Sequence, residues 1–420
     1  MYMFTTISHG SHRFRWAFCQ LEVLRQCFPP SIRRVLEELP ESLDETYQRI
    51  LRSISKANRG LAHQVLQCLV TAVRPLCVEE LAEVLAIDFD TGRTPKLNAG
   101  WRWADQRDAV LSACSSLVAI VNDGDSRIVQ FSHFSVKEFL TSIRTAESSR
   151  DISCFHIVLE PAHTILAQAC LGVLLRLDEH MDKEIIKNFP LAEYAAEHWA
   201  SHARFGNVLS LIKDGIDCLF DAEKPYFAVW RWVFNIQYSA RPRMMEPDRP
   251  KETPLCIAAL LGLRDLVERL LIKHPGDLNI EGSSLGSPLC AAVARGHAHV
   301  TSLLLAHGAN ANFKGTGRYH LPPMHQTSQY GHVEIGKQLL DYGADVDLRN
   351  NVGGTTLHVS ALCNTVEFAR MLLEHDALVD ATDRWGRTPL RIAEAYGHLN
   401  IARLLREHGQ GGRTDEGIPE

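Results

Sequence analysis

One short pattern occurs five times in the C-terminal part of this 420-residue chain, and it constrains the fold more than any other feature. Thr or Ser, usually followed by Pro and Leu, leads through small apolar residues to a Gly or Asn, and a second apolar run follows. The five copies are Thr253–Gly262, Ser287–Gly296, Pro322–Gly331, Thr355–Asn364 and Thr388–Gly397. Their third residues recur at intervals of 34, 35, 33 and 33. Such a constant period indicates a repeat protein.

Each part of the pattern has a physical role. Thr or Ser caps a short helix, and Pro at the first helical position lacks only an N–H that would have no partner there. The final Gly, replaced once by Asn364, favours the left-handed conformation that ends a helix. One unit cannot bury its apolar faces, whereas stacked units form a continuous core. The T-P-L-H, the central Gly and the late L-L-x-x-G-A resemble the ankyrin repeat, which implies five ankyrin repeats over residues 251–410.

The composition is that of an ordinary globular protein, with 45% hydrophobic and 22% charged residues. A net charge of −6 gives no long-range attraction to nucleic acid or to an anionic membrane. The eleven cysteines contain no C-x-x-C pair, which fits buried thiols in a reducing compartment. The first residues lack the apolar core of a signal peptide, and no apolar run is long enough to span a bilayer. We therefore expect a cytoplasmic protein with no nucleic-acid and no membrane partner.

The part before the repeats is predicted to be mainly helical. Apolar periodicity predicts helices over Leu61–Val73, Leu76–Ile87 and Asp105–Leu117. The segment Val118–Phe131 contains two alternating runs around Asn-Asp-Gly-Asp, which is typical of a β-hairpin. Helices followed by a small hairpin indicate a winged-helix domain, which we place at residues 41–145.

The following region predicts a helical spacer at residues 146–245, because Ala162–Leu177 and Leu191–Ala203 are both amphipathic. The fold class is thus mainly α, with a winged-helix domain and a helical spacer before an ankyrin-repeat α-solenoid. The Gly-rich polar tail, residues 411–420, is predicted to be disordered.

Several strings before the repeats carry a second resemblance, among them FRWAFCQLEVLRQC, LPESLDETYQRIL, RPLCVEELAEVLAID and SHFSVKEFL. They resemble the region that follows the NACHT nucleotide-binding domain in fungal NACHT–ankyrin proteins. Those proteins belong to the STAND signalling ATPases, the fungal counterparts of NOD-like receptors. The resemblance implies that residues 1–40 are a helical remnant of the end of a NACHT module. It also implies association with full-length relatives as one class of partner.

The sequence departs from that family in one respect, because no Walker A motif with its Ser or Thr occurs in the chain. The nearest match, Gly331–Gln338, ends in Gln and falls in the second helix of the third repeat, where backbone N–H groups cannot surround a phosphate. We therefore expect no ATP binding, no cofactor and no enzymatic activity. The expected function is that of a protein-interaction scaffold, similar to the sensor and regulatory half of a fungal NOD-like receptor. The alternative is a fragment of a STAND ATPase whose NTPase core lies upstream.

Three other motifs favour structural interpretations. Gly282–Gly286 matches G-x-S-x-G but bridges two repeats instead of joining a buried strand to a helix. His198 and His202 have zincin spacing, but Trp199 replaces the general base and no third ligand is evident, so no metal is expected. The histidines of T-P-L-H, at positions 325 and 358, are expected to bond the backbone between repeats.

Surface recognition remains as the expected activity. The predicted recognition helix of the winged-helix domain, Asp105–Leu117, has one Arg, two Asp and no Lys, which disfavours DNA binding. In ankyrin arrays a protein partner contacts the concave face, formed by hairpin fingers and first helices. Exposed aromatic and Arg side chains there are the types that anchor interfaces. The candidate protein-binding residues are Arg295, Phe313, Gln326, Gln329, Tyr330, Arg349, Arg384, Trp385 and Tyr396.

Overall fold

The chain divides into two compact units, residues 1–248 and 249–420. The computed structural model describes residues 42–89, 94–102, 105, 110, 114–124, 126–178, 180–182, 184–238, 252–281, 286–314 and 321–411. The predicted NACHT remnant (1–40), most of the predicted recognition helix and the tail beyond residue 411 lie outside the described residues.

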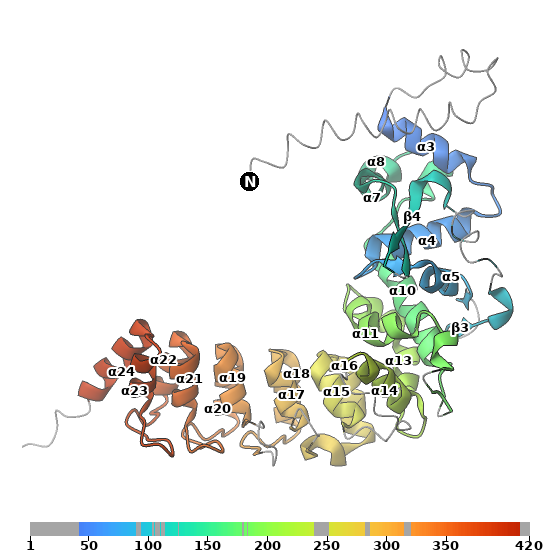
Figure 1. The fold of residues 1–420 in the computed structure, drawn as a ribbon. Coiled ribbons are helices and arrows are strands. Elements are labelled where there is room, and N and C mark those ends of the chain that lie inside the picture. Colours follow the sequence, from blue (N-terminus) through green and yellow to red (C-terminus); the bar gives the residue numbers. More distant parts are fainter. Residues whose placement is uncertain are drawn as a thin grey trace, which may run out of the picture. The chain divides into compact units, whose positions relative to one another are not determined.

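The first unit contains a winged-helix domain (Figure 1). Helix α4 (Arg59–Thr71) leads to a short strand β1 (Leu76–Cys77) and helix α5 (Val78–Val84). The hairpin of β4 (Val118–Asp123) and β5 (Ser126–Phe131) completes an antiparallel sheet of order β1-β5-β4. This hairpin lies where the sequence predicts it, because its turn residues and apolar alternation are local signals.

One predicted helix begins differently. The sequence predicts a single helix over Leu76–Ile87, but its first two residues form β1, which pairs Leu76 with Val129 of β5. At the other end, β2 (Ile87–Asp88) pairs with β3 (Lys96–Leu97) in a two-stranded sheet. Both ends are therefore strands because segments outside the predicted helix, β5 and β3, supply their backbone partners. Sequence periodicity carries no signal for such pairing.

In the remainder of this unit the long helix α10 (Leu159–Leu174) packs against α4, α11, α12 and α13. A cluster of aromatic side chains lies nearby: the ring of Trp199 on α11 is 5.5 Å from Trp230 and 6.0 Å from Phe220. The helices of this unit not given above are α3 (Leu43–Ser53), η2 (Ala99–Trp101), η3 (Ser115–Leu117), α7 (Phe134–Thr141), α8 (Ile143–Ala146), α9 (Arg150–Ser153), η4 (Ile186–Asn188), α11 (Ala192–Ala203), α12 (Val208–Leu211), α13 (Lys213–Leu219) and α14 (Tyr226–Tyr238).

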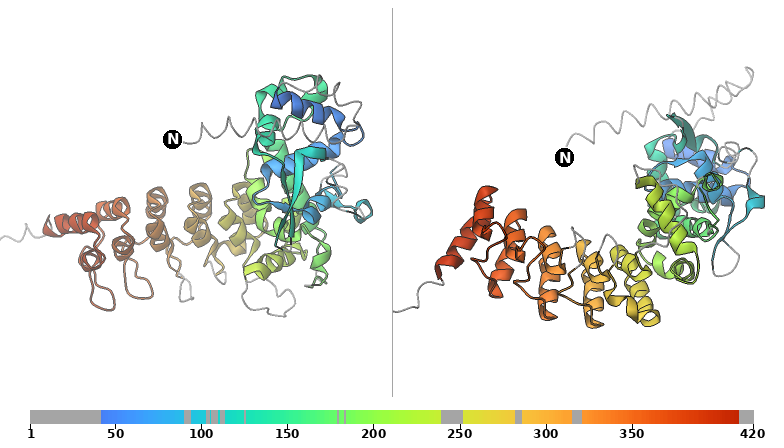
Figure 2. Two further views of the ribbon diagram at one scale, coloured as in Figure 1. Left: turned by 45° about the horizontal axis from the view of Figure 1, so that its top comes forward. Right: turned by 60° about the horizontal axis from the view of Figure 1, so that its bottom comes forward.

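The second unit is a stack of five helix pairs, drawn from yellow to red in Figures 1 and 2. The first helices of the pairs contact one another in series, and so do the second helices. The pairs are α15 (Pro254–Leu261) with α16 (Arg264–Lys273), α17 (Pro288–Ala294) with α18 (Ala298–Ala306), α19 (Pro323–Tyr330) with α20 (Val333–Asp341), α21 (Thr356–Cys363) with α22 (Val366–Glu374), and α23 (Pro389–Ala395) with α24 (Leu399–Gly411). A short turn, η5 (Pro275–Asn279), follows α16.

The predicted end of each first helix is confirmed. Gly262, Gly296, Gly331, Asn364 and Gly397 all have positive φ, between 58° and 73°. At Gly262 a second constraint applies, since a Cβ atom there would lie 2.7 Å from the ring of His297 in the next repeat. That ring also lies 3.0 Å from the carbonyl oxygen of Leu260 through its Nε2 atom. The Gly thus ends one helix and lets the next repeat approach.

Hydrogen bonds also connect successive repeats at the other end of the first helices. His325 Nε2 lies 3.1 Å from the carbonyl oxygen of Gly354, and His358 Nε2 lies 3.0 Å from that of Arg387. The prediction that these histidines bond the backbone between repeats is confirmed. Both rings are buried, so neither faces a substrate-sized opening.

Within the part of the chain that the structure describes, no helix combines the length and the apolar character needed to cross a bilayer.

Candidate protein-binding surface

The candidate surface is the inner face of the repeat stack, formed by the first helices α15, α17, α19, α21 and α23 and by the fingers that precede them. A finger is the loop that joins one helix pair to the next, and the fingers project on one side of the stack (Figures 1 and 2). We number them in chain order, so the third precedes α21 and the fourth precedes α23. Because each first helix packs against its neighbours, corresponding residues of successive repeats form rows along this face.

One row consists of the residues that end the first helices. Tyr330 and Tyr396 occupy the corresponding position of the third and fifth repeats, directly before a Gly, and are 57% and 59% exposed. Each tyrosine ring stacks on a histidine two residues later, with ring centroids 5.9 Å apart for His332 and 6.1 Å apart for His398. These contacts hold two large aromatic rings in defined orientations while leaving more than half of each accessible.

A third exposed aromatic side chain, Trp385, lies on the fourth finger and is 55% exposed. The guanidinium carbon of Arg384 lies 4.1 Å from its ring centroid, and that of Arg387 lies 4.5 Å away. The finger itself is fixed by Asp383, whose Oδ1 accepts hydrogen bonds from the backbone N–H groups of Trp385 and Arg387. Burial alone would raise the pKa of Asp383, but these bonds and the Arg387 side chain outweigh it and hold the pKa below its usual range.

The other predicted residues differ in accessibility. Arg295 and Gln329 are exposed on the first helices, as predicted from their positions. Phe313 is half-buried, and Gln326 is half-buried with its amide donating to the carbonyl of Leu321. The exposed Arg349 donates to the carbonyl oxygens of Gly353 and Thr382, at 2.9 and 2.6 Å, and so joins the third finger to the fourth.

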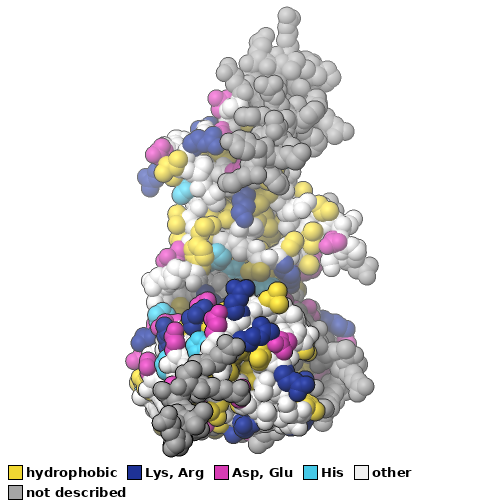
Figure 3. Space-filling model, turned by 90° about the vertical axis from the view of Figure 1, so that its left-hand side faces the viewer, with side chains coloured by type: hydrophobic (Ala, Val, Ile, Leu, Met, Phe, Trp, Pro, Cys, Tyr) yellow, Lys and Arg dark blue, Asp and Glu magenta, His cyan; other side chains and the backbone are white. Residues whose placement is uncertain are grey.

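Sequence reasoning missed the role of Arg387 and Asp383 in positioning Trp385. The available signal was the spacing Asp383-x-Trp385-x-Arg387, since an Asp side chain commonly bonds N–H groups two and four residues later in a turn. Figure 3 shows one face of the molecule, on which dark blue and magenta side chains are interspersed.

His198 and His202, the histidines with zincin spacing, lie on α11 in the first unit. The rings of both contact the ring of Tyr194. His202 is fully buried, with Nδ1 2.9 Å from His163 Nδ1 and Nε2 2.9 Å from the hydroxyl of Tyr194. Burial, together with the smaller effects of the neighbouring His163 and His198, lowers the pKa of His202 to about 3. Because both ring nitrogens of His202 have polar partners, this side chain joins α10 to α11. Among the described residues, no group of three His, Cys, Asp or Glu side chains is arranged to hold a metal ion.

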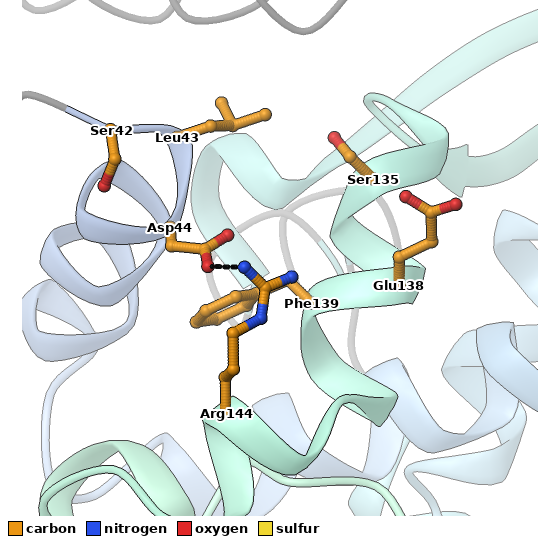
Figure 4. A pocket seen from close by; sticks show the side chains of 7 residues that line it. All are labelled: Ser42, Leu43, Asp44, Ser135, Glu138, Phe139 and Arg144. Atoms are coloured by element: carbon orange, nitrogen blue, oxygen red, sulfur yellow. Dashed lines mark hydrogen bonds and ion pairs between the residues drawn. The ribbon is translucent and has the colours of Figure 1, made fainter. Parts of the chain in front are cut away.

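A pocket of about 310 Å³ also lies in the first unit (Figure 4). It is lined by Ser42, Leu43, Asp44, Ser135, Glu138, Phe139 and Arg144. Arg144 Nη1 pairs with Asp44 Oδ2 at 2.6 Å, and Ser135 Oγ contacts the hydroxyl of Tyr47 at 2.7 Å and His133 Nδ1 at 2.5 Å. These polar groups satisfy one another, so we assign no ligand to the pocket.

The phosphate-loop-like string lies on α20, as its sequence position predicts, and Gly336 within it packs against Phe368. The G-x-S-x-G match, residues 282–286, falls largely outside the described residues.

Two family models match the chain. The model of ankyrin repeats covers residues 255–350 and 324–415, and the model of the GPI inositol-deacylase winged helix domain covers residues 47–151. The chain thus carries ankyrin repeats and a winged-helix domain of the GPI inositol-deacylase type. This agrees with the predicted fold class.

Curated relatives extend this likeness. The chain is 32% identical over 296 residues to the azaphilone pigments biosynthesis cluster protein L of Monascus ruber, which covers 66% of this chain and 61% of that protein. An ankyrin repeat protein of Fowlpox virus is 33% identical over 152 residues, or 35% of this chain and 43% of the viral protein. The human SH3 and multiple ankyrin repeat domains protein 2 is 38% identical over 73 residues, or 17% of this chain and 4% of that protein. The chain therefore spans less than two thirds of each of these relatives.

Proposed function

We propose that this chain is a non-enzymatic scaffold that binds a protein partner through the inner face of its ankyrin repeats. The observation that carries the proposal is the set of exposed aromatic side chains, Tyr330, Trp385 and Tyr396, on a rigid stack. Aromatic rings supply a large contact area at a low entropic cost, and they are enriched among the residues that dominate binding energy. Ankyrin repeats are protein-binding modules in general, which supports the assignment.

We also propose a cytoplasmic location and a regulatory role like that of the sensor half of a fungal NOD-like receptor. The winged-helix match and the fungal relative support the second point. The cysteines within the described residues are free thiols, which suits a reducing compartment.

The winged-helix match equally suits the alternative function, that of a fragment of a STAND ATPase with its NTPase core upstream. Transcript mapping distinguishes the two, because an in-frame Walker A motif would establish the ATPase.

We propose that the chain is non-enzymatic because several potentially nucleophilic side chains are either protonated by burial or bonded to other groups of the protein. Burial raises the pKa of Cys68 to about 12 and also raises the pKa values of Cys114 and Cys170, so these thiols are poor nucleophiles. The hydroxyl of Ser135 and the ring of His202 have polar partners within the protein.

We predict that the purified chain neither binds nor hydrolyses ATP, because it lacks a phosphate-binding loop. Isothermal calorimetry with Mg-ATP should show no saturable heat, and a phosphate-release assay should match the buffer rate. Saturable binding in the micromolar range would overturn this part of the proposal.

We predict that Tyr330→Ala or Trp385→Ala weakens partner binding by about 1–3 kcal/mol, because each removes a large exposed anchor. Thermal stability should change little, since more than half of each side chain is already exposed. The measurement uses the full chain to select peptides from a displayed random library, followed by fluorescence anisotropy with the selected peptides.

Glu334→Ala is the matched control, because Glu334 is exposed on the second helix α20, away from the first helices. The inner-face assignment is wrong if this change abolishes binding while Tyr330→Ala has no effect. It is equally wrong if the full chain selects no peptide at all.

A further inference from the structure

The fourth finger carries an unusual concentration of arginine side chains. Arg384 and Arg387 lie on the finger, and Arg391 lies in the first turn of α23 directly after it. Arg349 reaches the same place from the third finger, because its Nη1 atom donates to the carbonyl of Thr382 at 2.6 Å. A backbone bond from Arg384 N to the carbonyl of Val352, 3.1 Å long, holds the two fingers together. We call the four side chains the arginine cluster.

Two carboxylates near these arginines are already paired, and Asp376 and Asp380 of the same finger form no ion pair among the described residues. Asp383 is buried and forms an ion pair with Arg387, at 2.8 Å. Glu394, one turn beyond Arg391, forms an ion pair with Arg406 at 2.6 Å. Among the described residues, neither Arg384 nor Arg391 forms an ion pair, and both are exposed. The cluster therefore presents at least two unpaired positive charges on a chain whose net charge is −6.

The pKa of His358, whose ring bonds the fourth finger, is lowered. Burial lowers this pKa first, and its bond to the carbonyl of Arg387 and the charge of Asp383 oppose that effect. The positive charges of Arg349 and Arg387 lower it further.

The place of Arg391 in the repeat pattern bears on whether its guanidinium group can bind a partner. It corresponds to His325 and His358 in the T-P-L-H pattern, whose rings bond a carbonyl of the following finger. The Arg391 side chain is exposed, and among the described residues it forms no ion pair.

The contacts at Trp385 favour a carboxylate over a nucleic acid as the anion that the arginine cluster binds. The guanidinium groups of Arg384 and Arg387 lie over the indole ring, so the protein's own cations occupy the surface on which a nucleic-acid base would stack. A stacked guanidinium keeps its in-plane N–H donors, which match the two oxygens of a carboxylate. The same finger thus offers charged donors together with the apolar edge of Trp385.

We propose that the arginine cluster binds an acidic peptide segment of a protein partner, one whose Asp or Glu side chains pair with Arg384 and Arg391 while an apolar residue contacts Trp385. This inference rests on the proposed function and specifies the chemistry of the partner. Binding through charged pairs at an exposed surface weakens as salt screens them.

The test uses the full chain and the peptides that it selects from a displayed random library. Asp and Glu should be enriched among the selected sequences, and raising the salt concentration should weaken their binding. Arg384→Glu should weaken the binding of the selected acidic peptides by about tenfold or more, because reversing the charge replaces attraction with repulsion. A fresh selection with Arg384→Glu, Arg391→Glu should shift the enrichment away from acidic residues.

The control is Arg370→Glu, which makes the same change of net charge on the second helix α22 and should leave peptide binding unchanged. Circular dichroism checks that each variant keeps its helices. Peptides without acidic enrichment that still require Tyr330 or Trp385 would overturn this inference and leave the proposed function intact. Binding of a labelled oligouridine more tightly than the acidic peptides, with loss on Arg384→Glu, would also overturn it.

Discussion

Replacing Leu339 with alanine is expected to lower the free energy of unfolding by about 2–5 kcal/mol, the range for leucine truncations in well-packed cores. Leu339 is fully buried on α20, which packs against α18, α19 and α22. The truncation leaves a cavity that these helices cannot fill without moving. Leu304, fully buried on α18, should respond in the same way, whereas the neighbouring Leu303 is half-exposed and should respond less.

Urea denaturation of the full chain gives this free energy, and Leu399→Ala is the matched control. Leu399 begins α24 and is 75% exposed, so its truncation should change stability by about 0.5 kcal/mol or less. Hydrogen exchange should show faster opening in the repeats on both sides of Leu339, because each repeat is stabilised by its neighbours. Faster exchange limited to the mutated repeat would contradict this coupling.

Acidification is expected to destabilise the repeat stack through His325. The pKa of this histidine is lowered from 6.5 to about 4, mainly by burial and to a smaller extent by the charges of His358 and Lys314, against the opposing effect of its bond to the Gly354 carbonyl. The unfolded chain therefore binds a proton more readily than the folded chain, and stability rises with pH in this range. The contribution is complete above pH 6.5 and is lost as the pH falls toward 4, a change of about 3 kcal/mol.

The measurement is the stability difference between the wild-type chain and His325→Gln as a function of pH. The wild-type advantage should shrink as the pH falls from 7.5 to 4, because only the wild type has this buried imidazole to protonate. His299→Gln is the control, since His299 is exposed on α18. A difference that does not vary with pH would show that His325 is not the group responsible.

The exposure of the candidate aromatic residues was largely predictable, because their positions follow from the repeat. Tyr330 and Tyr396 occupy the last position before a Gly in two copies, so their exposure follows once the first helices are aligned. Gln326 was less predictable, because it turns toward the carbonyl of Leu321. Its rotamer depends on the loop that precedes α19, and the repeat pattern does not describe that loop.

Elements whose causes are local could be predicted from the amino-acid sequence. The Thr or Ser caps, the five left-handed helix ends and the β4–β5 turn each depend on a few adjacent residues, and the period of about 33 residues requires the stack. Only the tertiary structure decided that Leu76 joins a strand, that His202 lies between His163 and Tyr194, and that Arg349 reaches the fourth finger. Except for the contact between His202 and Tyr194, which both lie on α11, these contacts join residues on different elements. Their free energies depend on burial and geometry that no local pattern records.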